Sequence, residues 1–590
     1  MNMLTFLFFT IIFNFCSNQI NYKNLSRIVD TNFFVLDSFN LNQIKSHMYG
    51  FTVTTKGIFT DNYYKKIGYY EEPEPQGVFI MIRKINDEIR INQDFYGSFG
   101  LYLYENEKTG YFALSNSFLL LQEYLIGKQI FSLNKDFADN LVISGFCSPS
   151  IHETLVKEII KLPSNAMIII NISKMKYNIY YIDYKENSIE FGTDESLKII
   201  DKWVDKWGYI IRSLQKQTDN ISSDLSGGLD TRMILSIILS SGIDLNKILI
   251  RSHNDTIHVH AEDFRIASNI SSKLNFKLNN FSLDDKGTKL SMKDSLSCST
   301  YTKLGFHKEF YLKDKFFTNP RFSLSGSGGE ILRGFPGLDY KTYIEQMSRG
   351  VINIKGDEFY NSSMRLCNRS LDLLKREKTY ENDFEISAAL YCKGSMRNHN
   401  GKADVEGFIV NIYGLEPLID PDIKKIKFNI NEKFPHDLIA YIYVRFAHDL
   451  INFPVEGKRY INPESIKKAE ILNKKLPPYN IKKDFNENFY IDKERKCPVS
   501  DTNNKQEVND YLKEIFYSQK FINIINKIYD KNILQFAENY MNKSNFYPLR
   551  HVYGLLAIAK TLEDITLNEN FFNKIECDRF LENQEKLFGW

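Results

Sequence analysis

Cysteine is scarce in this chain and widely scattered. The seven cysteines among 590 residues lie at positions 16, 147, 298, 367, 392, 497 and 577, and no two of them form a C-x-x-C pair. A zinc site needs Cys or His ligands at short spacings, and a small disulfide-stabilised domain needs a dense cysteine framework. The spacing therefore excludes both, and it favours a reducing compartment such as the cytosol.

The chain also lacks an excess of charge of either sign. The 75 Lys and Arg residues nearly balance the 73 Asp and Glu residues, so the formal net charge is +2, and the basic residues form no dense block. A protein whose main partner is nucleic acid usually carries a basic patch or stripe. We therefore expect no nucleic-acid partner.

No apolar run is long enough to span a bilayer. The strongest run, residues 3–16, has no Lys or Arg before it and no small-residue cleavage site after it. A secretory signal is the alternative interpretation, which sequencing of the mature N-terminus would test. A buried first strand fits better, so we expect a cytoplasmic protein without a membrane partner.

Apolar and aromatic residues are abundant. Hydrophobic residues make up 43% of the chain and aromatic residues 14%. A chain of this length is expected to form about two to four domains, and its composition is sufficient for large, sheet-rich cores.

The most specific feature of the sequence is Ser-Gly-Gly-Leu-Asp-Thr at residues 226–231. It follows a short run ending in Asp224-Leu225 and precedes a helical pattern that begins at Arg232. Small residues in such a place let backbone N–H groups and the positive end of a helix face an anion. A glycine-rich surface turn is the alternative. The pattern predicts a pyrophosphate-binding loop made by Leu225, Ser226, Gly227, Gly228, Asp230 and Thr231.

This motif and its place in the chain resemble the asparagine synthetase family, whose synthetase domain uses ATP to convert a carboxylate into an acyl-adenylate. Residues 247–251 look like the next parallel strand. Residues 260–275 are similar to a family helix that starts with an acidic pair, here Glu262 and Asp263. Acidic residues are common in any first helical turn, so this pair alone is a weak sign of catalysis.

Residues 323–334 resemble the family's "SGxGADELxGG" turn. The resemblance implies that Asp230 and Glu330 both bind magnesium, which usually takes one or two carboxylates together with substrate phosphates. Either residue alone would fit a helix cap or a surface ion pair equally well.

The same turn departs from the family pattern. Ser327 stands where asparagine synthetases carry a Glu next to the reacting acyl group, Glu330 stands in place of an Asp, and Ile331 replaces the acidic residue that follows. The longer side chain of Glu330 can still place its carboxylate on a magnesium ion. The missing Glu argues against aspartate as the substrate and for an altered acyl pocket.

Later segments also look family-like. Residues 396–402 lead to residues 415–421, which are similar to a "P(F/L)LDP" stretch, and residues 453–459 lie where relatives keep a lysine that neutralises phosphate charge. A lysine can do this as a compact point charge. Lys458 is the candidate, with Lys402 and Arg459 as rivals and a solvated surface lysine as the alternative.

The resemblance also places the rest of the nucleotide. The backbone around Arg251 and Ser252 is expected to hold adenine, and Ser325 and Gly326 are expected to lie near the ribose and the acyl group.

The N-terminal third lacks the nucleophile that glutamine-using members expose. Those members begin Met-Cys-Gly, whereas this chain begins Met1-Asn2-Met3, and Cys16 lies inside an apolar run. Glutaminase activity is therefore not expected. Alternating or β-branched segments, some similar to glutaminase strands, still predict a sheet sandwich from residues 79–83, 88–92, 94–104, 111–116, 166–171 and 177–181.

We therefore predict an α/β protein with two domains. Residues 1–188 form a degenerate amidotransferase-like αββα sandwich of the Ntn-hydrolase kind. Residues 195–590 form a parallel-sheet nucleotide domain that begins with a helix over 195–214 and ends in a helical tail at about 505–590. Hinges are expected at residues 185–194 and 497–506, and tail helices at 508–527 and 549–562.

The expected activity is an asparagine synthetase-like ATP- and Mg²⁺-dependent ligase that joins a carboxylate to ammonia or an amine, with Asp230, Glu330 and Lys458 as catalytic residues. Amidation of a sugar acid, asparagine synthesis from free ammonia and ring closure as in β-lactam synthetases all stay open, as does a homodimer. A non-catalytic relative that binds a nucleotide or a protein is the alternative from another class. The intact loop argues against it.

Overall fold

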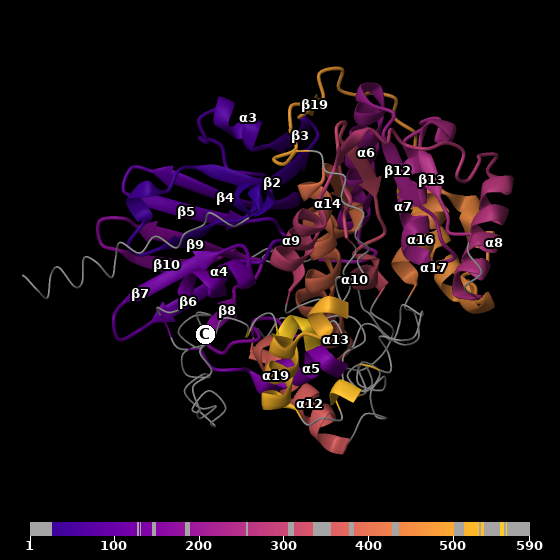
Figure 1. Ribbon diagram of the computed structural model, residues 1–590. Coiled ribbons are helices and arrows are strands. Elements are labelled where there is room, and N and C mark those ends of the chain that lie inside the picture. The colour runs from indigo at the N-terminus through magenta and orange to yellow at the C-terminus, as the bar shows by residue number, and fades with distance from the viewer. Residues whose placement is uncertain are drawn as a thin grey trace, which may run out of the picture.

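A computed structural model describes the chain from residue 26 to residue 500, with gaps, and pieces of the C-terminal segment (Figure 1). The gaps are residues 127–128, 130, 144–148, 183–188, 255–257, 305–311, 334–355, 377–382 and 428–435. Beyond residue 500 the described residues are 513–529, 533–535, 538, 555–559 and 562. The apolar run at residues 3–16 lies outside these ranges. Within them, no helix combines the length and apolarity that a membrane crossing needs.

The N-terminal part consists of two mostly antiparallel sheets (Figure 1). The larger sheet has the strand order β10-β9-β5-β4-β2-β3-β19, and the smaller one has the order β1-β7-β6-β8. Their strands are β1 Val35–Asp37, β2 His47–Thr54, β3 Gly57–Thr60, β4 Gly77–Ile85, β5 Glu88–Gln93, β6 Tyr102–Asn106, β7 Tyr111–Ser115, β8 Ile159–Lys161, β9 Ala166–Asn171, β10 Lys176–Tyr181 and β19 Tyr490–Ile491.

Apolar side chains from both sheets meet in one core. Alternation along a strand turns every second residue inward, so Ile80 of β4 and Leu103 of β6 belong to the same cluster. The rings of Phe112 and Tyr177, one from each sheet, lie 4.8 Å apart. Helices α4 (Phe118–Leu125) and α5 (Lys135–Ile143) pack against the smaller sheet, and α3 (Asp61–Lys66) packs against the larger one. The predicted two-sheet layering is present.

The strand predicted over residues 94–104 is wrong for residues 94–101. The buried Asp94 carboxylate accepts hydrogen bonds from the backbone N–H groups of Phe79, Tyr96 and Ser98, which closes a turn. Gly97 and Gly100 have φ values of 67° and 75°, which a strand does not allow. The chain becomes extended again only at Tyr102, where β6 begins. The other five predicted strands are present.

A parallel sheet forms the second part of the molecule. Its order is β13-β12-β16-β17, with β12 Ile221–Asp224, β13 Leu249–Arg251, β16 Arg321–Leu324 and β17 Ile412–Leu415, and every pairing is parallel. The chain adds β13 on one side of β12 and β16 on the other, so the strand order reverses between β12 and β16. In open α/β sheets, ligands bind at the carboxyl ends of the strands beside such a reversal.

Helices surround this sheet (Figure 1). The predicted helix over residues 195–214 is present as α6 (Asp194–Gln217), whose buried face includes Trp203 and Trp207. The remaining helices of this part are α7 Leu229–Ser240, α8 His258–Lys273, α9 Met292–Lys303, α10 Gly329–Arg333, α12 Gly356–Arg376, α13 Asp383–Leu390, a π-helix at Tyr391–Gly401, α14 Lys402–Ile409, α15 Pro421–Lys424, α16 Asp437–Phe446 and α17 Pro463–Asn473.

Segments from the C-terminal half complete the N-terminal sandwich. Strand β19 pairs with β3 at the edge of the larger sheet. Helix α19 (Gln519–Ile528) and the described residues 555–559 share a core with α4, α5 and the smaller sheet. The helix predicted over residues 508–527 is therefore interrupted within its described part, because the Ser518 hydroxyl caps a new helix at Gln519. The described pieces of the expected tail pack on the sandwich.

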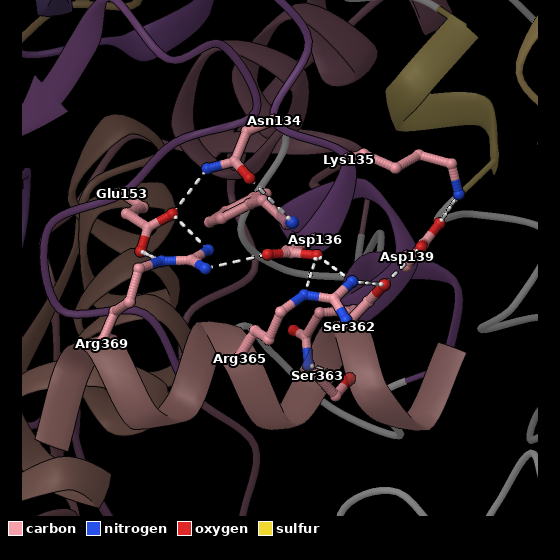
Figure 2. A network of polar contacts seen from close by, with 11 residues as sticks. Asn134, Lys135, Asp136, Asp139, Glu153, Ser362, Ser363, Arg365 and Arg369 are labelled. Atoms are coloured by element: carbon pink, nitrogen blue, oxygen red, sulfur yellow. Dashed lines mark hydrogen bonds and ion pairs between the residues drawn. The ribbon is translucent and has the colours of Figure 1, made fainter. Parts of the chain in front are cut away.

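An ion network also ties α12 to the sandwich, as Figure 2 shows. Arg369 of α12 donates to Glu153 at 2.6 Å and to Asp136 of α5 at 2.8 Å. Arg365, one turn earlier, also donates to Asp136 at 2.6 Å, and Ser362 donates to Asp139 at 2.7 Å. These contacts fix the position of the helical segment that follows the predicted metal-binding turn.

Candidate functional site

The loop at residues 226–231 connects β12 to α7, as the sequence predicts. Helix α7 starts after Gly228, and no side chain caps its first turn. Inside the loop, the Ser226 N–H donates to Thr231 Oγ1 at 3.1 Å, and the Gly228 N–H donates to Ser226 Oγ at 3.0 Å. The motif's hydroxyl residues therefore hold the loop in a closed shape at an open helix N-terminus, which is a favourable place for an anion.

Asp263 lies directly on this loop. Its Oδ1 accepts the Gly227 N–H at 2.8 Å, and a Cβ atom on Gly227 would come within 2.5 Å of the same oxygen. Partial burial raises the pKa of the Asp263 carboxyl above its ordinary value. The helix α8 that carries the predicted acidic pair is thus placed against the loop, and its carboxylate occupies an N–H group that could otherwise face a phosphate.

The turn after β16 meets the start of α7. A Cβ atom on Gly329 would lie 2.3 Å from Asp230 Cγ, and a Cβ atom on Gly326 would lie 2.9 Å from the Thr231 backbone nitrogen. Both positions therefore require glycine. Glu330 directly follows Gly329, so its backbone lies beside Asp230, and both side chains are half-buried.

These two carboxylates are a donor set that suits magnesium. Groups of three or more His, Cys, Asp or Glu side chains that could hold a metal are absent from the described ranges. Magnesium does not need such a group, because it usually keeps several waters and shares substrate phosphates with one or two carboxylates.

Several backbone groups predicted to bind adenine already make hydrogen bonds to other parts of the protein. The Arg251 carbonyl accepts the Leu225 N–H at 2.7 Å, and the Arg251 side chain pairs with Asp224 at 2.9 Å. The Asn279 side chain accepts from the Ser252 N–H at 3.1 Å and donates to its carbonyl at 3.0 Å. The buried Ser252 hydroxyl has no hydrogen-bond partner in the described part of the chain, so it is the group at this point that can take a ligand.

Sequence reasoning missed Arg232. This fully buried arginine donates to the Gly227 carbonyl at 2.8 Å, to the Phe453 carbonyl at 3.2 Å and to the Pro454 carbonyl. The Glu456 N–H also donates to the Gly227 carbonyl, at 3.2 Å. Arg232 therefore holds the segment at residues 453–459 beside the phosphate loop. Its position directly after the motif was the available signal.

The three candidate lysine and arginine residues have different surroundings. Lys458 belongs to the short helical turn Glu456–Lys458, whose backbone lies beside the loop, and its side chain lies outside what the structure describes. Arg459 is exposed and donates to the Glu456 carbonyl at 3.1 Å. Lys402 is fully buried and donates to the Phe99 carbonyl of the sandwich. The Lys402 amine therefore contacts the sandwich, whereas the role for which it was considered is to neutralise phosphate charge.

A pair of carboxyl groups, the half-buried Asp404 and the buried Glu416, was also missed. Ser325 donates to the Glu416 carboxylate, with Oγ to Oε distances of 2.8 and 2.6 Å, and is 2.8 Å from Ser327 Oγ. Burial raises the pKa of Glu416 to about 7, and burial together with the neighbouring Glu416 raises the pKa of Asp404 well above its usual range. Both carboxyl groups therefore hold a proton more readily than an isolated carboxyl does. Glu416 directly follows β17, at the same sheet edge as the loop.

This pair borders a cavity of about 340 Å³ at the carboxyl ends of β12, β16 and β17. Its lining includes Asp224, Lys313, Ser325, Ser327, Asp404 and Glu416. The cavity therefore offers one cation, a carboxyl pair and several hydroxyl groups within reach of the turn that carries Glu330. A small polar molecule with a carboxylate fits this chemistry.

Comparisons with known proteins do not add a family assignment. A scan against models of known protein families finds no match, and a search of curated proteins finds none.

Proposed function

We propose that the chain is an ATP-dependent ligase that adenylates a carboxylate and then forms an amide with ammonia or an amine. The observation that carries the proposal is the meeting of the 226–231 loop with the turn at residues 326–329, where the strand order of the parallel sheet reverses. An open helix N-terminus, small loop residues and two carboxylates together suit magnesium pyrophosphate.

The residues of the site fit ATP and magnesium. Gly326 and Gly329 leave no room for a Cβ atom against Thr231 and Asp230, so the turn lies close against the start of α7. Asp230 and Glu330 would hold magnesium, which supplies positive charge to the pyrophosphate. Ser252 and the backbone at Arg251 would contact the adenine, Ser325 and Gly326 the ribose and acyl group, and Lys458 the phosphates.

The reaction has two steps. The substrate carboxylate attacks the α-phosphorus, the bond to pyrophosphate breaks, and pyrophosphate leaves into the 226–231 loop. The amine nitrogen then bonds to the acyl carbon, the bond to AMP breaks with its electron pair on the phosphate, and the nitrogen's proton passes to a base. Fixed dipoles and charges stabilise both charge shifts.

The 340 Å³ cavity is the proposed site of the acyl substrate. Lys313 would attract its carboxylate, and Ser327 in place of the family's Glu argues against aspartate. A sugar acid or another small metabolite, asparagine formation with free ammonia, and ring closure remain the candidate outcomes. The sandwich would be an amidotransferase-like domain kept for packing or for shaping the pocket. The four described cysteines are free thiols, which fits a cytoplasmic enzyme.

A non-catalytic relative that binds a nucleotide or a protein is the second candidate. One observation favours it, namely that Asp263 occupies the Gly227 N–H group. In that case a nucleotide would bind weakly, because its phosphate has to displace a carboxylate.

Titration calorimetry with ATP, in the presence of Mg²⁺ or of a chelator, tests the proposal. We expect Mg²⁺-dependent binding that is lost in Asp230→Asn and weakened in Glu330→Gln. Asp219→Asn, an exposed residue ahead of β12, is the matched control and should bind as the natural chain does. Equal binding by Asp230→Asn and Asp219→Asn would overturn the assignment of the site.

A further inference from the structure

The sandwich reaches the carboxyl edge of the parallel sheet at one small cavity. This cavity, of about 10 Å³, has Gln76 and Tyr96 of the sandwich on one side and Asp404 and Glu416 on the other. Its volume suits a single molecule the size of water or ammonia. The carboxyl pair lines both this small cavity and the large one.

Two side chains that line the small cavity have unsatisfied polar atoms. Tyr96 and Gln76 are 8% and 7% exposed, and neither the Tyr96 hydroxyl nor Gln76 Oε1 has a hydrogen-bond partner among the described residues. The Gln76 amide nitrogen donates to the Glu416 carbonyl at 3.3 Å, which directs that side chain toward the pair. Buried polar atoms are nearly always satisfied in folded proteins, so these atoms point to a ligand.

The polar atoms that line the small cavity indicate which kind of ligand it can bind. The unsatisfied atoms are an amide carbonyl oxygen and a phenol oxygen, beside the oxygens of two carboxyl groups. Among the described residues, Glu416 makes no ion pair with Lys or Arg, and Lys313 lies in the lining of the large cavity, so an ionised Glu416 is a buried negative charge without a bonded cation. A buried charge of this kind requires compensation. A small cation with several N–H donors provides the charge and the hydrogen bonds together, whereas water provides two donors and no charge.

We propose that Asp404, Glu416, Tyr96 and Gln76 form a binding site for a cationic nitrogen. The ligand is either the ammonium ion or the protonated primary amine of a small substrate. This inference rests on the proposed function, because it places the nitrogen substrate of the ligase beside the cavity proposed for the acyl substrate. It also gives the sandwich a direct part in the site, since Gln76 and Tyr96 precede and follow strands β4 and β5.

The site is close to the proposed point of chemistry. Ser325 connects Glu416 to Ser327, in the turn that also carries Gly329 and Glu330. A nitrogen held by Glu416 would therefore lie at the side of the cavity nearest the metal-binding turn.

Binding is tested on the full chain without nucleotide. Thermal unfolding is followed at pH 8 in ammonium, sodium or potassium chloride of equal ionic strength, and titration calorimetry gives affinities. We expect ammonium to raise the melting temperature above that in sodium or potassium chloride. Glu416→Gln should abolish the difference. Tyr96→Phe should weaken binding about 5- to 10-fold, as the loss of one hydrogen bond implies.

Tyr64→Phe is the matched control, because Tyr64 is also buried in the sandwich and its hydroxyl lies 3.2 Å from Thr52 Oγ1. Methylammonium and ethanolamine distinguish the two sources of nitrogen. If they bind as well as ammonium, the ligand is an amine head, and if they do not, it is the free ion. Equal effects of potassium and ammonium, or no effect of either, would overturn the proposal. The test needs no ATP, so its outcome is independent of the proposed ligase activity.

Discussion

Gly329 packs directly against the carboxylate of Asp230. A Cβ atom on Gly329 would come within 2.3 Å of both Asp230 Cγ and Asp230 Oδ1. No real pair of atoms packs so closely, so a side chain at this position has to displace the carboxylate. The contact joins the loop after β12 to the turn after β16, and it is the geometric basis of the proposed magnesium site.

Gly329→Ala is therefore expected to lower the affinity for Mg²⁺-ATP at least about tenfold, or about 1.4 kcal/mol, because Asp230 must move. Gly208→Ala is the control. Its Cβ would meet the flexible end of Arg212 at 3.2 Å, in the interior of α6. Titration calorimetry of both variants makes the comparison, and unchanged affinity in Gly329→Ala would contradict the contact.

Glu416 gives the fold a pH dependence of known sign. Burial raises its pKa from an ordinary 4.5 to about 7, so the folded chain holds a proton that the unfolded chain releases between these values. Stability from this group is fully present below about pH 4.5 and is lost as the pH rises through 7. The pKa shift corresponds to roughly 3–4 kcal/mol.

Urea unfolding at pH 5 and pH 8 measures this effect. Asp94 contributes with the same sign, because burial raises its pKa to about 6, so the natural chain should lose stability through both groups. Glu416→Gln isolates the first contribution, since it cannot titrate, and should lose less stability over the same range. An identical loss in both proteins would show that Glu416 is ionised in the fold.

Arg369 is expected to matter more than Arg365 for the docking of α12. Arg369 bonds both Asp136 and the buried Glu153, whereas the Arg365 side chain is 54% exposed. Arg369→Met leaves Glu153 buried without its partner, which should cost about 2–4 kcal/mol. Arg365→Met should cost less than about 1 kcal/mol. Chemical denaturation of the two variants gives the comparison, and equal costs would argue against the network in Figure 2.

Helix α19 is expected to stabilise the N-terminal sandwich. Ile525 is fully buried in the core that α19 shares with α4 and α5. Ile525→Ala should lower the free energy of unfolding by about 2–4 kcal/mol through the cavity it leaves. Lys527→Ala, on the exposed face of the same helix, should stay within about 0.5 kcal/mol. If the two variants were equally stable, α19 would not belong to this core.

The local parts of the site were predictable from the sequence, because their chemistry lies within a few consecutive residues. The loop at residues 226–231, the helix after it and the turn that carries Glu330 all have the predicted layout. Most sandwich strands were predictable from alternation as well. At Asp94, hydrogen bonds from one side chain to three backbone groups overrode that pattern.

Long-range contacts were not predictable. The Asp404–Glu416 pair depends on the packing of α14 against β17, and Arg232 reaches Phe453 only in the folded chain. Strand β19, which pairs with β3 at the edge of the sandwich, is only two residues long, so its sequence shows no strand alternation. Such features depend on which elements meet, and a single sequence carries little information about that.

Pyrophosphate release tests the proposed ligase activity. Purified protein is supplied with ATP, Mg²⁺ and a panel of small carboxylates that includes aspartate and uronic acids, together with ammonium or glutamine. We expect release with at least one acid, loss of that release in Asp230→Asn, and amide formation with ammonium but not with glutamine. Absence of release with every acid, from protein that is folded and binds ATP, would contradict the ligase assignment and favour a non-catalytic nucleotide-binding protein.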